Sequence, residues 1–301
     1  MVRTHHSGAL GLKLGIDPHS GFCYGVIRAI QEAERYLAQS TPLYSLGALV
    51  HNNEELERLR KIGLSTVEPH QLSSIAGQTV IIRAHGEPPE TYIQAQELGI
   101  RIIDCSCPVV LKLQQKIKEE YRRIKPLNGQ IAIFGKKGHA EVNGLIGQLL
   151  GDALILEDGS QIDRLDFERP ISLFAQTTQN PPAFLGLCRQ IEEQYRLRGR
   201  NPEDYFCAYN TICQQVADRL PLLQAFAKQH QVIVFVCGKE SSNGRVLFQT
   251  CRSANSRSYA VENAEALSKS WFNAGDSVGI CGATSTPKWL MEKVAHAVRE
   301  M

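Results

Sequence analysis

The sequence predicts an α/β protein built from small, mostly parallel sheets. Short apolar, β-branched runs end at small or polar residues, and a helical pattern follows each run. Near-continuous apolar strands that alternate with helices are typical of parallel sheets covered on both faces. The 301 residues are enough for two or three units with their own cores, at roughly 100–200 residues per domain. We therefore expect several βα units.

The expected elements follow one another along the whole chain. Strands are expected at 79–83, 100–103, 130–134, 171–175, 232–236 and 277–280. Helices are expected at 25–39, 53–62, 89–98, 109–124, 180–197, 212–229 and 286–299. The polar stretch 197–204 is expected to be a linker that separates the last third of the chain from the rest.

Composition excludes several classes of protein. Hydrophobic residues make up 43% and charged residues 21%, which rules out an intrinsically disordered chain. The formal net charge of +2 argues against a strongly basic nucleic-acid-binding domain. The sequence contains no run of 18 apolar residues, so no membrane span is expected. Residues 1–10 contain two histidines and no apolar core of a secretory signal, so we expect a cytoplasmic protein.

The nine cysteines predict thiol chemistry rather than disulfides. Their number is odd and no C-x-x-C pair occurs, so metal or redox roles are the better expectation. Cys188, Cys237, Cys251 and Cys281 are expected to be small buried hydrophobic residues.

Three other cysteines stand where helices are expected to begin. Cys23 lies in a glycine-flanked turn, Cys107 precedes Pro108, and Cys213 opens the helix at 212–229. A helix N-terminus stabilises the thiolate, which is the form that binds metals. Three thiolates brought together would hold an iron–sulfur cluster with one iron left unligated. Ordinary packing explains each cysteine separately, so this alternative stays open.

Polar residues also gather just after the expected strands, where ligands bind in open α/β sheets. Histidine, serine and asparagine donors suit an anionic group such as a diphosphate, although each alone is also explained as a cap or a surface residue. His139 and Glu141, two residues apart, are reasonable groups for proton delivery. The sequence lacks both the G-x-x-x-x-G-K-[ST] loop and a G-x-G-x-x-G after a strand, so no nucleotide or nicotinamide site is indicated.

Taken together and in order, the motifs resemble those of the 4-hydroxy-3-methylbut-2-enyl diphosphate reductases, the last enzymes of the non-mevalonate isoprenoid pathway. The resemblance runs from about Lys13 to Val298. Its motifs are Gly21-Phe22-Cys23-x-Gly25-Val26-x-Arg28-Ala29, Val50-His51-Asn52, Ala84-His85-Gly86, Asp104-x-x-Cys107-Pro108, Gly138-His139-x-Glu141-Val142, Gln176-Thr177-Thr178, Thr211-Ile212-Cys213, Ser241-Ser242-Asn243 and Ala283-Thr284-Ser285-Thr286-Pro287.

The resemblance implies a three-lobed arrangement of small, mostly parallel α/β domains around a central iron–sulfur cluster. The lobes would comprise residues 25–107, residues 108–209, and residues 1–24 together with 210–301. It implies one [4Fe–4S] cluster with three Cys ligands, Cys23, Cys107 and Cys213, and one open iron that takes the substrate's terminal hydroxyl. The implied diphosphate-binding residues are His51, His85, His139, Ser241, Ser242, Asn243 and Ser285. The implied catalytic residues are Glu141 as the proton source and His139, Thr177 and Thr178, which orient the relay.

The implied activity is that of an oxidoreductase. It removes the hydroxyl of 4-hydroxy-3-methylbut-2-enyl diphosphate reductively and gives isopentenyl and dimethylallyl diphosphates. A ferredoxin or flavodoxin would donate the electrons, because no flavin or nicotinamide site is visible. The chain departs from the family pattern at Cys105, at Asp218-Arg219-Leu220 and at Gly244-Arg245.

Two alternative functions fit part of this motif pattern. A dehydratase similar to quinolinate synthase shares the lobes and the open-iron cluster, but the order of the His-Gly, His-x-Glu and Thr-Thr motifs favours the reductase. An iron–sulfur sensor or zinc-binding module without turnover would lack the polar donors for an anion, and this chain has a full set of candidates.

Overall fold

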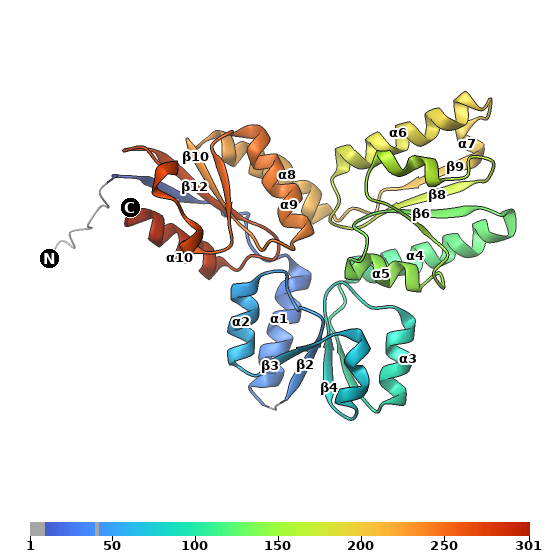
Figure 1. Ribbon diagram of the computed structural model, residues 1–301, viewed down its shortest axis with the longest axis horizontal. Helices are drawn as coiled ribbons and strands as arrows, with labels where there is room; N and C mark the ends of the chain where they lie inside the picture. The colour runs from blue at the N-terminus through green and yellow to red at the C-terminus, as the bar shows by residue number, and fades with distance from the viewer. Residues whose placement is uncertain (1–9, 40–41) are drawn as a thin grey trace. The chain divides into compact units, whose positions relative to one another are not determined.

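The computed structural model describes residues 10–39 and 42–301 and contains three four-stranded sheets (Figure 1). Within the described residues, every strand pair is parallel. The predicted α/β class and the three small parallel lobes are thereby confirmed. Residues 1–9, where no secretory signal is expected, lie outside the described residues.

The chain divides into two compact units. Unit 1 comprises Met1–Ile27, Val50–Ile62 and Asp218–Met301, and unit 2 comprises Arg28–Leu49 and Gly63–Ala217. Unit 1 holds one sheet and unit 2 holds the other two. The lobe boundaries given above stay a prediction.

The sheet of unit 1 has the strand order β1-β12-β10-β11. Its strands are β1 (Lys13–Ile16), β10 (Val232–Val236), β11 (Ser258–Val261) and β12 (Ser277–Gly282). The helices of this unit include α2 (Asn53–Lys61), α9 (Ser242–Ala254) and α10 (Lys288–Arg299), and helices α1 (Tyr24–Leu37) and α8 (Gln214–Lys228) begin or end in it. Val232, Val234 and Val236 face α10, whereas Ile233 and Phe235 pack against α8 and α9. Both faces are therefore buried, as the unbroken apolar sequence predicts.

The two sheets of unit 2 have the orders β3-β2-β4-β5 and β7-β6-β8-β9. The first is formed by β2 (Leu43–Leu46), β3 (Leu64–Val67), β4 (Thr79–Ile82) and β5 (Arg101–Asp104). The second is formed by β6 (Gln130–Phe134), β7 (Leu154–Leu156), β8 (Ile171–Ala175) and β9 (Phe206–Tyr209). The helices are α3 (Pro89–Glu97), α4 (Pro108–Ile124), α5 (Ala140–Gly147), α6 (Pro181–Leu197) and α7 (Pro202–Tyr205).

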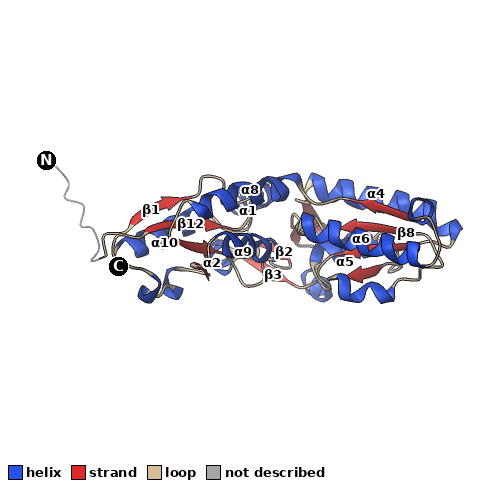
Figure 2. Cartoon of the chain, turned by 90° about the horizontal axis from the view of Figure 1, so that it is seen from above, coloured by secondary structure: helices blue, strands red, loops and turns tan. Residues whose placement is uncertain are grey.

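Helices pack against the strands of each sheet, as Figure 2 shows. In the sheet of β6 to β9, Leu173 and Ala175 contribute to a core with α6. Ile133 and Phe174 contribute to a second core with α4 and α5. In the sheet of β2 to β5, Val80 packs in a core that includes residues of α3. These cores fix the carboxyl ends of the strands, where the predicted site residues lie.

All three sheets repeat one strand order. We number the four strands of each sheet of unit 2 by their order along the chain. In each of these sheets, the second strand lies at one edge, the first lies beside it, and the third and fourth follow across the sheet. Unit 1 repeats this order with β11, β10 and β12, and β1 takes the place of the fourth strand (Figure 1, where the blue strand lies among orange and red ones). Equivalent loops therefore leave the first, third and fourth strands of every sheet at the same end.

The expected helices are confirmed, and one expectation about a linker is wrong. All seven expected helices are present, with ends that differ by no more than two residues from those predicted. The stretch 197–204 does not separate two domains, because it connects α6 to β9, and β9 pairs with β8 in the same sheet. Its polar character has a local cause: Gly199 adopts a positive φ of 69° after α6, and Asn201 caps α7. Among the described residues, no helix combines the length and apolar composition of a membrane span.

Candidate active site

The three cysteines predicted to be metal ligands occupy equivalent places in the three sheets. Cys23 directly precedes α1, Cys107 caps α4, and Cys213 directly precedes α8. Each follows an edge strand, β1, β5 or β9, and all three side chains are half-buried. Because a helix N-terminus favours the thiolate, each position suits a metal ligand.

The backbone of each cysteine is bound to the loop after the neighbouring strand. The N–H groups donate to carbonyl oxygens, over 3.1 Å from Cys23 to Thr284, 2.9 Å from Cys107 to Ala84 and 2.8 Å from Cys213 to Thr177. These acceptor loops carry the predicted residues Ser285, His85 and Thr177 themselves. In every sheet, a candidate ligand is thus fixed to a loop that carries a candidate substrate or proton-transfer residue.

Three side chains form hydrogen bonds to the backbone of the cysteine loops or of the loops beside them, a role that the sequence did not predict. Arg219 donates to the carbonyl of Gly21 over 2.7 Å. Arg28 donates to the carbonyl of Asp104 over 2.9 Å and to that of Ser106 over 3.4 Å. Thr211 donates to the carbonyl of Ala175 over 2.5 Å and accepts from its N–H over 2.9 Å. Arg28 lies within a recognised motif, but no local pattern says which carbonyl such a side chain binds.

The remaining cysteines lie in different surroundings. Cys105 is 1% exposed, and burial raises the pKa of its thiol to about 11. Burial likewise raises the pKa of Cys188 and of Cys237 to about 11, and it raises that of Cys281. Because a buried apolar site disfavours the thiolate, these four are poorer metal ligands.

In unit 1, three predicted diphosphate-binding residues lie together after β10 and β12. The hydroxyls of Ser241 and Ser285 are 3.1 Å apart, and Ser241 also caps α9 by accepting from the N–H of Gly244 over 2.9 Å. Asn243 accepts from the N–H and hydroxyl of Thr284 over 3.0 and 2.7 Å. Its amide nitrogen is buried and has no hydrogen-bond partner among the described residues. An unused buried donor of this kind suits an anionic ligand.

His51 belongs to the same unit. Its carbonyl oxygen lies only 2.3 Å from where a Cβ on Gly238 would stand, so this close approach requires glycine. The carbonyl of Gly238 in turn accepts from the N–H of Ser241 over 3.1 Å. Ser242, the first residue of α9, is half-buried. The loop of His51 thus packs against the loop that carries the serines.

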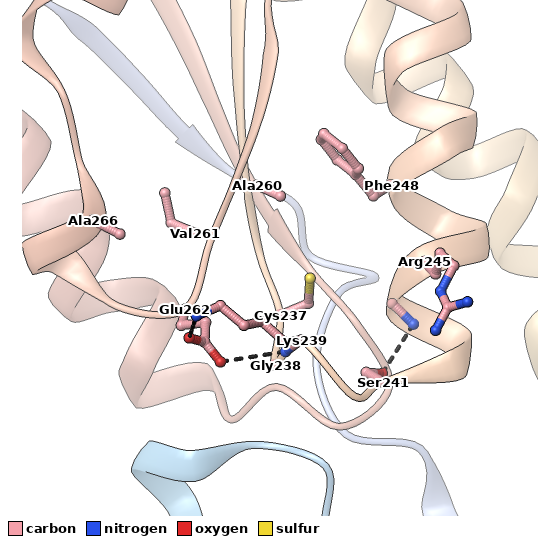
Figure 3. A pocket seen from close by; sticks show the side chains of 11 residues that line it. Cys237, Gly238, Lys239, Ser241, Arg245, Phe248, Ala260, Val261, Glu262 and Ala266 are labelled. Carbon is pink, nitrogen blue, oxygen red and sulfur yellow. Dashed lines mark hydrogen bonds and ion pairs between the residues drawn. The ribbon is translucent and has the colours of Figure 1, made fainter. Parts of the chain in front are cut away.

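A cavity of about 310 Å³ adjoins Ser241 on one side of α9 (Figure 3). Its lining includes Cys237, Arg245 and Phe248, and an ion pair of 3.1 Å joins Lys239 to Glu262 at its edge. Neither Asn243 nor Ser285 lines it, so Ser241 is the one member of that polar group that borders the cavity.

In unit 2, Glu141 is buried at the start of α5. Its two carboxylate oxygens accept from the N–H and the hydroxyl of Thr177 over 2.6 and 2.7 Å. Burial raises the pKa of Glu141 to about 7, although both bonds from Thr177 oppose this rise. The carboxyl can therefore hold or release a proton near neutral pH.

His139 lies two residues before Glu141, Thr178 follows Thr177, and His85 contacts His139. The Nδ1 atom of His139 caps α5 by accepting from the N–H of Glu141 over 3.2 Å. The rings of His139 and His85 meet edge to face, 4.9 Å apart at an angle of 78°. The hydroxyl of Thr178 accepts from the side chain of Gln176 over 2.9 Å. The two histidines thus bring the loops after β4 and β6 together.

The predicted site residues fall into two groups by unit. Unit 1 holds Cys23, His51, Ser241, Ser242, Asn243 and Ser285. Unit 2 holds His85, Cys107, His139, Glu141, Thr177, Thr178 and Cys213. In both units they follow the carboxyl ends of the first, third and fourth strands of a sheet. Unit 1 offers one thiol and donors for an anion, and unit 2 offers two thiols, two imidazoles and a titratable carboxyl.

Known proteins resemble this chain over nearly its full length. A family model described as LytB protein matches residues 16–299. A protein of Bacteroides fragilis named 4-hydroxy-3-methylbut-2-enyl diphosphate reductase is 46% identical over 288 residues, which cover 96% of this chain and 98% of the relative. A protein of the same name from Parabacteroides distasonis is 47% identical over 290 residues, with the same coverage of both chains.

Solved structures agree with this similarity. A structure of (E)-4-hydroxy-3-methyl-but-2-enyl diphosphate reductase, described as the terminal enzyme of the non-mevalonate pathway, is 30% identical. It covers 96% of this chain and 99% of its own, with a TM-score of 0.67. The E-1-hydroxy-2-methyl-but-2-enyl-4-diphosphate reductase of Plasmodium falciparum has a TM-score of 0.82 at 23% identity, covers 95% of this chain and 86% of its own, and shares the fold.

Proposed function

The chain belongs to the LytB family, and from this membership we propose that it reduces 4-hydroxy-3-methylbut-2-enyl diphosphate to isopentenyl and dimethylallyl diphosphates. One observation carries the proposal beyond the name of the relatives. Each candidate thiol ligand is hydrogen-bonded to a loop that also holds a candidate substrate or proton-transfer residue. This arrangement suits an enzyme that brings a metal group, an anionic substrate and an acid together.

We propose Cys23, Cys107 and Cys213 as the ligands of one [4Fe–4S] cluster with an open iron. The donor set fits, because these thiols are half-buried at helix N-termini, whereas Cys105, Cys188, Cys237 and Cys281 have raised pKa values. When bound, such a cluster supplies a Lewis-acidic iron that polarises the C–O bond and passes electrons singly.

The residues of the chain supply the proton and bind the anion in this proposal. The reaction breaks a C–O bond, forms a C–H bond and releases water, so it consumes protons as well as electrons. Glu141, with a pKa of about 7, protonates the leaving hydroxyl, and Thr177, Thr178 and His139 orient the transfer. The donors for the diphosphate are His51, His85, His139, Ser241, Ser242, Asn243 and Ser285. A small protein such as a ferredoxin or flavodoxin supplies the electrons.

Turnover under anaerobic conditions tests this function. The protein, with its cluster reconstituted, is mixed with 4-hydroxy-3-methylbut-2-enyl diphosphate and reduced methyl viologen, and the products are separated chromatographically. We expect both isoprenoid diphosphates, together with oxidation of viologen in proportion to product. Conversion of substrate without oxidation of viologen would identify a dehydratase instead, and no conversion at all would refute the proposal.

The pair Cys105 and Cys107 tests the ligand assignment. Cys107→Ala is expected to lose bound iron and turnover, because a shift of two residues moves a sulfur by several ångströms while metal–ligand distances hold to about 0.2 Å. Cys105→Ala, the matched control, is expected to keep most of both, since that thiol is buried and has a high pKa. Equal losses of iron in the two variants would contradict the assignment.

A further inference from the structure

We propose that the exposed N-terminal face of α4 is the docking surface for a small acidic electron carrier. This inference rests on the proposed function, which requires electrons from outside the chain. The surface, here called the entry face, comprises Val109, Leu111, Lys112, Gln115 and Lys116, all of which are exposed. It belongs entirely to unit 2.

The entry face begins beside a proposed cluster ligand. Cys107 caps α4, so Val109 and Leu111 lie about 3 and 6 Å further along the helix axis at 1.5 Å per residue. Their side chains are 40% and 43% exposed. Because residues two apart on a helix do not face each other, Val109 and Leu111 lie at the two edges of the exposed side of α4. An electron carrier must bring its redox group close to the cluster, and these two apolar side chains offer contacts beside Cys107.

Two cations lie between Val109 and Leu111 on the exposed side of α4. Lys112 and Lys116 are four residues apart and share this side. Within the described chain, neither lysine forms an ion pair. The sequence contains no acidic residue from Cys105 to Lys118, and the next carboxylate along the helix, that of Glu119, accepts a hydrogen bond from the side chain of Gln115. A negatively charged partner is therefore favoured and a positively charged one is repelled.

The entry face also reaches the strand that leads to a second proposed ligand. The ammonium of Lys116 lies 4.4 Å from the centroid of the Tyr209 ring, at the end of β9. That ring stacks on Phe174 at 4.6 Å, and Cys213 follows four residues later. The charged surface thus lies along two elements that hold proposed ligands.

This combination fits a transient electron-transfer complex better than a permanent subunit interface. Such complexes bury less than about 1,200 Å² and depend on opposite charges that guide the encounter. Their association rates fall as ionic strength rises. The entry face is small, with two lysines at its centre and one apolar residue at each edge, and it lacks the extended apolar area of an obligate interface.

Charge reversal with two reductants tests the inference. In the double variant Lys112→Glu and Lys116→Glu, kcat/KM with a reduced acidic [2Fe–2S] ferredoxin is expected to fall about tenfold or more, and its dependence on salt is expected to weaken. Turnover with saturating reduced methyl viologen should stay within about twofold of wild type, because a small reductant needs no docking surface. The matched control reverses Lys293 and Arg299, which are exposed on α10, and should leave both rates unchanged.

A second variant tests the two apolar residues at the edges of the entry face. Val109→Ser with Leu111→Ser is expected to lower kcat/KM for ferredoxin several-fold while keeping the salt dependence and the viologen rate. Unchanged ferredoxin kinetics in the charge-reversed variant, an equal loss with viologen, or an equal loss in the α10 control would overturn the docking surface. If the wild-type protein turned over with viologen but not with ferredoxin, the docking surface would also be overturned. If it turned over with neither reductant, the proposed function would be refuted.

Discussion

At the scale of single residues, Glu141 differs from the other buried glutamates in having no cationic partner. Glu55, Glu87 and Glu120 each form an ion pair with an arginine. Among the described residues, the carboxylate of Glu141 is bonded by Thr177 alone. Burial raises the pKa of Glu141 to about 7, and burial also raises that of Glu87 to about 7 although Arg83 lowers it. Glu141, which pairs with no described cation, is suited to carrying a proton rather than to holding the fold together.

The substitution Glu141→Gln tests the proton donor. Glutamine keeps the shape and still accepts from Thr177, but it cannot deliver a proton. Iron content, the cluster spectrum and substrate binding are expected to stay at wild-type values, while turnover falls about 10²–10⁴-fold, the usual contribution of a positioned acid. Iron analysis, absorption spectra and single-turnover rates measure these quantities. Near-normal turnover would leave Glu141 only the structural role of bonding Thr177.

Thr177 provides a prediction for the pH dependence. Turnover requires protonated Glu141, so it is expected to fall as pH rises through about 7. The hydroxyl of Thr177 lowers the pKa of Glu141, and Thr177→Val removes this bond while keeping the backbone bond. The falling limb of the pH–rate profile should therefore move upward, by about one unit if the bond is worth about 1.5 kcal/mol. Thr178→Val is the matched control and should leave the midpoint in place, and a downward shift in Thr177→Val would contradict the account.

Asn243 provides a prediction for the anion. Its Oδ1 atom accepts twice from Thr284, and its Nδ2 atom is the unused donor. Asn243→Asp keeps both accepted bonds, removes that donor and adds a negative charge that repels the anion. The dissociation constant of pyrophosphate, measured by calorimetry, is expected to rise about tenfold or more, since a hydrogen bond to a charged group is worth about 1.5–3 kcal/mol. The control Asn201→Asp, at the cap of α7, should leave the dissociation constant of pyrophosphate unchanged. An affinity of Asn243→Asp equal to that of wild type would exclude this donor from the anion site.

At the scale of elements, the loop that carries Cys107 depends on a side chain from a different helix. Arg28 of α1 donates to two carbonyls of this loop. Arg28→Met keeps the length of the side chain and removes both bonds, so the loop should open more often. Loss of iron to a chelator is expected to be about twofold to tenfold faster, which corresponds to a bond of about 0.5–1.5 kcal/mol.

The control for this prediction lies on the same helix. Arg35 is exposed and pairs with Glu32 within α1. Arg35→Met should release iron at the wild-type rate, because a surface pair of this kind contributes little. Equal release from the two variants would show that Arg28 does not hold the loop.

Sequence patterns predict some elements better than others, for physical reasons. Long amphipathic helices such as α4 and α6 follow from their apolar spacing. No range was predicted for helices α5 and α9, although helix starts were expected near Glu141 and Asn243, because α5 is short and contains two glycines, while Ser241-Ser242-Asn243-Gly244 is also typical of a turn. In the structure, Ser241 caps α9 and the packing of Leu247 in the core stabilises the helix that follows. Tertiary contacts outweigh local propensity here.

At the scale of the whole molecule, the three sheets share a strand order that their sequences do not reveal. The three candidate ligands are separated by 84 and 106 residues, so no local spacing marks them as a set. The repeated order explains their equivalence, because each follows the edge strand beside the third strand of its sheet. The sequence could predict which residues follow strands. It could not predict the bonds of Arg28, Arg219 and Thr211, which depend on how distant segments meet.

The central claim, an open-iron [4Fe–4S] cluster that binds the substrate, is tested most directly by Mössbauer spectroscopy. The protein would be purified anaerobically and measured with and without 4-hydroxy-3-methylbut-2-enyl diphosphate. The account predicts a cluster in which one iron differs from the other three and changes its isomer shift when the substrate is added. Four iron atoms that remain unaffected by the substrate, or a protein that binds no cluster, would contradict it.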